Sequence, residues 1–81
     1  MEDFARLREA MQTRYGASEG LRVFQTVVPG ILSDFMKMMA KAPAGVSVQE
    51  EYILEDHKGR IVLRAESRTG KPVIRAEFIP Y

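Results

Sequence analysis

Five basic residues gather in the last third of the chain, and their types and spacing come nearest to a recognisable chemistry. They are Arg60, Arg64, Arg68, Lys71 and Arg75. Guanidinium and ammonium groups bind phosphates and carboxylates, so the segment 60–75 indicates binding of an anionic ligand or a nucleic acid. The formal net charge is only +1, whereas dedicated nucleic-acid binders usually carry a strong basic excess. We therefore rank this function second and do not expect a nucleic-acid partner.

The other reactive side chains do not form a catalytic or metal-binding set. His57 is the only histidine, and its setting between Asp56 and Gly59 predicts a solvated turn residue. The adjacent acids Glu50 and Glu51 point to opposite faces if they lie on a strand, so they cannot act as a carboxylate pair. The chain has no cysteine, which removes disulfides and thiol catalysis. We expect no catalytic residue, metal or cofactor, and we lean against an enzyme.

Residues 46–81 read as three consecutive β-strands. Apolar side chains alternate along the middle segment at Ile61 and Leu63, and along the last at Ile74 and Phe78. The segments 56–59 and 68–71 have turn compositions. The pattern predicts a three-stranded antiparallel meander.

If both hairpin loops have an even number of residues, the alternating apolar side chains of all three strands lie on the same face of the sheet. The first hairpin then pairs Leu54 with Ile61, Tyr52 with Leu63, Glu55 with Arg60, Glu51 with Arg64, and Ile53 with Val62. The second pairs Ala65 with Ile74, Leu63 with Ala76, Ile61 with Phe78, and Arg64 with Arg75. A slip of one residue would turn a whole apolar set toward water, so burial should enforce the facing of each strand.

Residues 1–42 read as helical. A first amphipathic helix should end near Gly16, with Ser18 as N-cap of the next helix. An apolar stripe then continues at helical spacing through Pro29, where we expect either a kink or a break with a restart at Pro29. A short strand over Val23–Val28 is the weaker alternative. The last helix should end at Lys41 or Ala42.

The fold class expected is α+β, with N-terminal helices packed on one face of the meander. We expect a single domain over 1–81, with a helical layer in 1–42 and the sheet in 46–81. The apolar fraction of 46% is ordinary for a globular protein. We find no signal peptide and no apolar run of the roughly 18 residues that a membrane span needs. With no cysteine in the chain, these features favour a cytoplasmic protein without a membrane partner.

Surplus apolar residues favour association with another chain. The second sheet face carries hydrophobic side chains, the last strand is an edge bracketed by Pro72 and Pro80 with its middle free to pair, and the long helix has a wide stripe. The interface candidates are Val23, Val27, Met36, Met39, Ile53, Val62, Val73 and Ile79. We predict a small non-catalytic protein–protein interaction or assembly module, acting as a homodimer, with another protein as a possible partner.

A third hypothesis is a small-molecule pocket between helices and sheet. Its candidate lining is Tyr15, Phe24, Phe35, Glu50 and Tyr52. The four aromatic residues suit a plain core equally well. Glu50 breaks the apolar alternation of its strand, so we expect it at the margin of the sheet or paired with an arginine.

Overall fold

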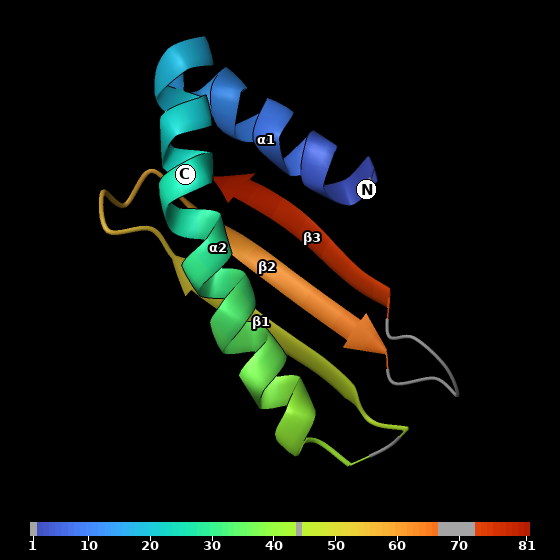
Figure 1. The fold of residues 1–81 in the computed structure, drawn as a ribbon. Helices are drawn as coiled ribbons and strands as arrows, with labels where there is room; N and C mark the ends of the chain where they lie inside the picture. The colour runs from blue at the N-terminus through green and yellow to red at the C-terminus, as the bar shows by residue number, and fades with distance from the viewer. Residues whose placement is uncertain (1, 44, 67–72) are drawn as a thin grey trace.

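The computed structural model describes residues 2–43, 45–66 and 73–81. Two helices precede three strands, in the order α1 (Glu2–Tyr15), α2 (Ala17–Lys41), β1 (Ser47–Ile53), β2 (Gly59–Glu66) and β3 (Val73–Pro80). The strands form one antiparallel sheet with the order β1-β2-β3 (Figure 1). The α+β class and the meander predicted from the sequence are therefore confirmed. The predicted turn 68–71, with Arg68 and Lys71, lies outside the described residues.

The two helices are joined by a single residue, Gly16. Its φ of 100° and ψ of 156° lie in a region that is essentially restricted to glycine, because a Cβ would clash with the backbone. The amide of Gly16 closes α1 by donating to the carbonyl of Gln12 at 2.8 Å. The prediction of Ser18 as N-cap was wrong: α2 begins at Ala17, and Gly16 holds the cap position without a side-chain hydrogen bond.

Helix α2 runs through Pro29 as one element of 25 residues. Neither the break at Pro29 nor the alternative strand over 23–28 is found. Apolar burial outweighs the local cost of the proline, because Val28 and Phe35 on either side both pack into the core. The helix ends at Lys41 with Ala42 as C-cap, as the sequence predicted.

The second hairpin has the predicted register. Ile61 pairs with Phe78, Leu63 with Ala76, Ala65 with Ile74, and Arg64 with Arg75. Both strands carry an uninterrupted apolar set on the same face, and this alignment buries all of it, whereas a slip of one residue would expose the set of one strand.

The predicted register of the first hairpin was wrong by two residues. Tyr52 pairs with Ile61, and the Leu54 amide donates to the carbonyl of Gly59 at 3.0 Å. The loop has four residues, 55–58, rather than the predicted 56–59. Gly59 belongs to β2, where it pairs with Pro80 of β3, and a Cβ there would lie 2.6 Å from Phe78 Cε1. His57 takes the left-handed conformation of the loop instead, with a φ of 57°.

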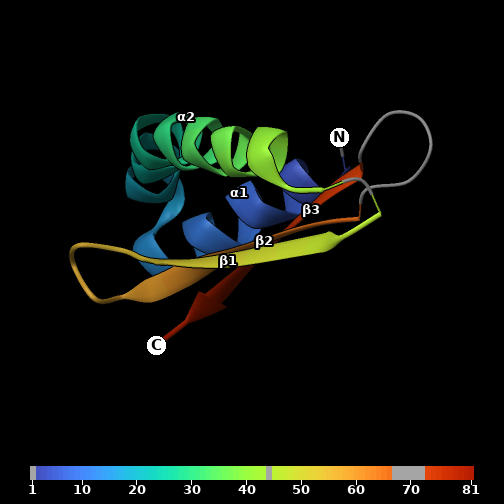
Figure 2. The same cartoon turned by 90° about the horizontal axis from the view of Figure 1, so that it is seen from below.

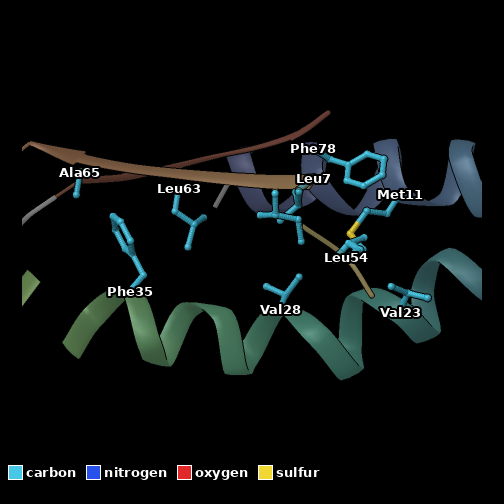
Figure 3. Packing of buried hydrophobic residues seen from close by; sticks show 10 residues of the cluster. Leu7, Met11, Val23, Val28, Phe35, Leu54, Leu63, Ala65 and Phe78 are labelled. Carbon is cyan, nitrogen blue, oxygen red and sulfur yellow. The ribbon is translucent and has the colours of Figure 1, made fainter. Parts of the chain in front are cut away.

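Because the shift is even, each strand keeps its predicted facing. Both helices lie on one side of the sheet, and no described residue covers the other side (Figure 2). Figure 3 shows Val23, Val28 and Phe35 projecting from α2 toward the sheet, with Leu7 and Met11 contributed by α1. Phe35, Leu7, Met11, Ile61 and Leu63 are almost completely buried. Each such side chain contributes about 1.5–3 kcal/mol of transfer free energy, so this layer contact is the main support of the fold.

Candidate functional site

The side of the sheet without helices is the first candidate for a binding surface, and we call it the open face. Its members are the strand residues that alternate with the core positions: Ser47, Gln49, Glu51, Ile53, Arg60, Val62, Arg64, Val73, Arg75, Glu77 and Ile79. Large apolar side chains lie at its margins, with Ile53 exposed by 61% and Val73 by 62%. Val62 lies at the centre of this face. Its side chain is only 8% exposed, although it is not part of the core cluster between the sheet and the helices. The open face is therefore an amphipathic surface.

A groove of about 840 Å³ adjoins the open face where α1 lies alongside β3. Its apolar lining includes Leu7, Val62 and Val73, and its charged lining is Asp3, Arg6, Arg64, Arg75 and Glu77. This volume falls within the range of ordinary ligand pockets. The combination of apolar and charged lining suits a partner that brings both kinds of group.

Helix α1 also closes the outer edge of β3. The carboxylate of Asp3 accepts a hydrogen bond from the Ala76 amide at 3.4 Å and pairs with Arg75 Nε at 2.9 Å. Pro80, at the end of the strand, has no amide hydrogen to offer. The expectation that the middle of this strand is free to pair was therefore wrong, because a residue from the far end of the chain occupies it.

The basic candidates are only partly brought together. Arg64 and Arg75 are directly opposite each other and share the groove. Arg60 lies two rows further along the same face, with its Nε 3.7 Å from Glu51 and its guanidinium 5.9 Å from the centre of the Tyr81 ring. The predicted pairs Glu51–Arg64 and Glu55–Arg60 are not formed, because of the two-residue shift; Arg64 Nε donates to Gln49 Oε1 at 3.2 Å instead. Ile53 faces Arg60 rather than Val62 for the same reason.

The interface candidates divide into buried and accessible residues. Val23 and Val27 face the core, where Val23 is only 8% exposed, and Met39 packs against the same cluster. Met36 is 56% exposed on α2. The remaining four candidates, Ile53, Val62, Val73 and Ile79, all lie on the open face. The exposed large apolar side chains are thus divided between the sheet, with Ile53 and Val73, and α2, with Leu21, Met36 and Met38.

The residues proposed for a pocket between the layers do not line the groove. Phe35 is fully buried and Phe24 packs against the core cluster. Tyr15 points to the first hairpin, where its hydroxyl donates to Asp56 Oδ1 at 2.9 Å. Glu50 is half-buried on the edge strand β1, opposite Leu63, so its predicted position at the sheet margin is confirmed.

Tyr52 has a buried hydroxyl with no hydrogen-bond partner among the described residues. Burial raises the pKa of this hydroxyl, and the charges of Glu50 and Asp34 raise it further. The group stays protonated at neutral pH, so it is a neutral hydroxyl beside two carboxylates, with no basic side chain to activate it.

Asp3 and Arg6, the two charged side chains that α1 contributes to the groove, were absent from every set of candidates in the sequence. In the sequence they read as ordinary solvated residues on the polar side of an amphipathic helix. Only the docking of α1 against β3 brings them to the groove, so no local sequence pattern indicates them. Within residues 2–43, 45–66 and 73–81, no group of histidine and acidic side chains could hold a metal ion. No helix in the same ranges has the length and hydropathy needed to cross a membrane.

Comparisons of the chain with protein-family models, with curated proteins and with solved structures give no match. The functional argument therefore starts from the open face and the groove.

Proposed function

We propose that this chain is a small non-catalytic assembly module that self-associates through the open face of its sheet. The observation that carries the proposal is the distribution of exposed apolar side chains: Ile53, Val73 and Tyr81 are each more than half exposed around one side of a three-stranded sheet. A sheet with helices on one side only leaves its other side for water or for a partner. The same proposal places the module in the cytoplasm, which the absence of cysteine supports.

Multi-angle light scattering and sedimentation velocity test self-association directly. A chain of 9.2 kDa should show a weight-average mass that rises toward twice that value over a concentration series reaching about 100 μM, the range in which a weak interface is populated. A mass that stays at 9.2 kDa throughout would contradict the proposal.

Two lysine substitutions of matched exposure locate the contact. Val73→Lys places a charge on the open face, whereas Met36→Lys places one on α2 at a side chain that is exposed to a similar degree. We expect the first to weaken association at least tenfold and the second to leave it unchanged, because a charge buried at an interface without a partner is strongly unfavourable. The reverse result would move the interface to α2.

Binding of an anionic ligand is a second candidate, supported by the approach of Arg6, Arg64 and Arg75 to one groove. It ranks lower because Asp3 already pairs with Arg75 and because Glu77 shares the lining. A gel-shift assay with a short oligonucleotide tests it at low salt, where contacts to phosphate are strongest. Binding that Arg64→Ala weakens would support it, and no shift at low salt would end it for nucleic acids.

A further inference from the structure

Charges on the open face are sorted into rows that run across the strands. Three successive rows of cross-strand neighbours are Ile53–Arg60–Ile79, Glu51–Val62–Glu77 and Gln49–Arg64–Arg75. Consecutive rows are about 7 Å apart, because each step covers two residues of a strand. An acidic row and a basic row therefore lie side by side on one surface.

The basic row is incompletely neutralised by its own chain. Arg64 and Arg75 are directly opposite each other, an arrangement that costs energy unless opposite charges are near. Arg75 has Asp3 as a partner, whereas the hydrogen bond of Arg64 goes to the neutral amide of Gln49. The acidic row is the nearest source of complementary charge. It is displaced from the arginines along the strand direction, in the plane of the sheet, and does not lie above them. A second surface with the same rows could supply carboxylates from above.

We propose that the open face binds a second copy of itself about a two-fold axis that crosses the strands between the acidic and the basic row. This inference rests on the proposed self-association and adds its geometry. Each strand then lies antiparallel over its own copy. Glu77 lies over Arg75 of the second copy, and Arg75 lies over Glu77 of the second copy by symmetry. Arg64 lies over Val62 of the second copy, with the carboxylates of Glu51 and Glu77 of that copy at the diagonal positions.

The same axis also matches the apolar margins of the two faces. It places Ile79 over Val73 of the second copy, and the reverse contact repeats at the other end. Val73 lines the groove between α1 and β3, so the groove has room for an isoleucine side chain from above. The axis therefore accounts for both the exposed valine and the hollow beside it.

Other two-fold arrangements of the same faces are disfavoured by charge. An axis that runs along the central strand β2 stacks Glu51 over Glu77 and Arg64 over its own copy. An axis that passes through the acidic row brings carboxylates together, and one through the basic row brings arginines together. Juxtaposed like charges are strongly unfavourable across an interface, so among these arrangements the row order favours the axis between the acidic and the basic row.

The predicted contact is small. A strand of eight residues is about 26 Å long and three strands span about 14 Å, so the flat area is about 370 Å² per copy. This is the scale of weak, transient interfaces, for which we expect dissociation constants in the micromolar range and a marked dependence on salt.

Charge reversal on either row tests the arrangement. The variants are Glu77→Arg alone, and Arg75→Glu combined with Asp3→Asn. The asparagine removes the repulsion that Asp3 would exert on the reversed side chain and keeps an oxygen for the Ala76 amide. Each variant alone should associate at least about tenfold more weakly than wild type, because residues 75 and 77, which stack on each other across the axis, then carry charges of the same sign. An equimolar mixture of the two should recover association to the level of wild type.

Matched controls separate row contacts from a change in net charge. Glu55→Arg reverses an exposed acid in the first hairpin loop, and Arg14→Glu reverses an exposed base on α1; neither lies on the open face. Both should associate like wild type, whereas Asp3→Asn alone measures how far the loss of the Asp3–Arg75 ion pair itself changes association. Circular dichroism of every variant verifies folding, and if a reversal does not fold, Glu77→Gln should weaken association about two- to fivefold by removing the same contact.

The outcomes distinguish this inference from the function on which it rests. A monomeric wild type overturns both. A wild-type dimer that tolerates the reversals, or single variants that fail to recover when mixed, leaves self-association in place and overturns the two-fold arrangement proposed for it.

Discussion

The phenol of Tyr15 links the end of α1 to the first hairpin. Its hydroxyl donates to Asp56 at 2.9 Å, its ring lies 6.4 Å from that of Phe78, and the Lys58 ammonium lies 5.2 Å from the ring centre. Asp56 Oδ1 in turn accepts a hydrogen bond from the Lys58 amide at 3.0 Å, which stabilises the loop. Burial and the hydrogen bond to Asp56 raise the pKa of Tyr15 from 10.0 to about 12, because both disfavour the phenolate.

Tyr15→Phe should therefore change both the stability and its dependence on pH. Loss of the hydrogen bond should lower the free energy of unfolding by about 1 kcal/mol at neutral pH. Since the pKa is higher in the folded protein, the contribution of Tyr15 is complete below pH 10 and is lost as the pH rises toward 12. Urea unfolding between pH 7 and 12 should show the difference between wild type and variant shrinking over that interval. A difference that is constant with pH would contradict this assignment.

The position of Gly59 explains why one hairpin register was predictable and the other was not. Alternation fixes which face a side chain takes, and this was correct for every strand. It cannot separate registers that differ by two residues, and Asp56-His57-Lys58-Gly59 favoured a turn ending at the glycine. In the folded sheet Gly59 instead lies within β2, paired with Pro80 and against the Phe78 ring, a long-range placement that the local turn composition does not indicate.

At the scale of elements, the crossing of α1 and α2 depends on Gly20. A Cβ at this position would lie 2.6 Å from the backbone nitrogen of Gln12 and closer still to its Cα. These are backbone atoms that no rotamer change can move. Together with the single-residue joint at Gly16, Gly20 allows the two helices to meet closely enough for Leu7 and Met11 to reach the core.

The same substitution at two glycines of α2 should have opposite effects. Gly20→Ala forces the helices apart, and we expect a loss of about 1–3 kcal/mol in unfolding free energy, as for other overpacked sites. Gly30→Ala meets no atom within 4 Å, so it should gain about 0.5–1 kcal/mol through helix propensity. Thermal and urea unfolding of the two variants measure this. Equal effects from both would show that the close crossing does not limit stability.

At the scale of the whole molecule, the two edge strands of the sheet, β1 and β3, differ in what covers their outer edges. Asp3 of α1 binds the Ala76 amide on β3, whereas Figure 2 shows no helix alongside the outer edge of β1. Glu50 and Glu51 place a charge on each side of β1, a common protection of edge strands against pairing. The sequence predicted the strands and the charges. It could not predict that α1 docks on β3 and brings Asp3 and Arg6 to the groove, because that placement follows from long-range packing.

Two substitutions of Asp3 separate its ionic role from its role as a hydrogen-bond acceptor. Asp3→Asn loses the ion pair with Arg75, whose side chain is 68% exposed, so stability should change by about 0–1 kcal/mol. Asp3→Ala also loses the acceptor for the Ala76 amide and should cost about 0.5–1 kcal/mol more. Amide hydrogen exchange followed by NMR should show faster exchange at Ala76 in the alanine variant than in the asparagine variant, with Val62 of the central strand unchanged. Equal exchange at Ala76 in wild type and Asp3→Ala would mean that α1 does not protect this edge through Asp3, and that the packing of the helix against β3 is sufficient to close it.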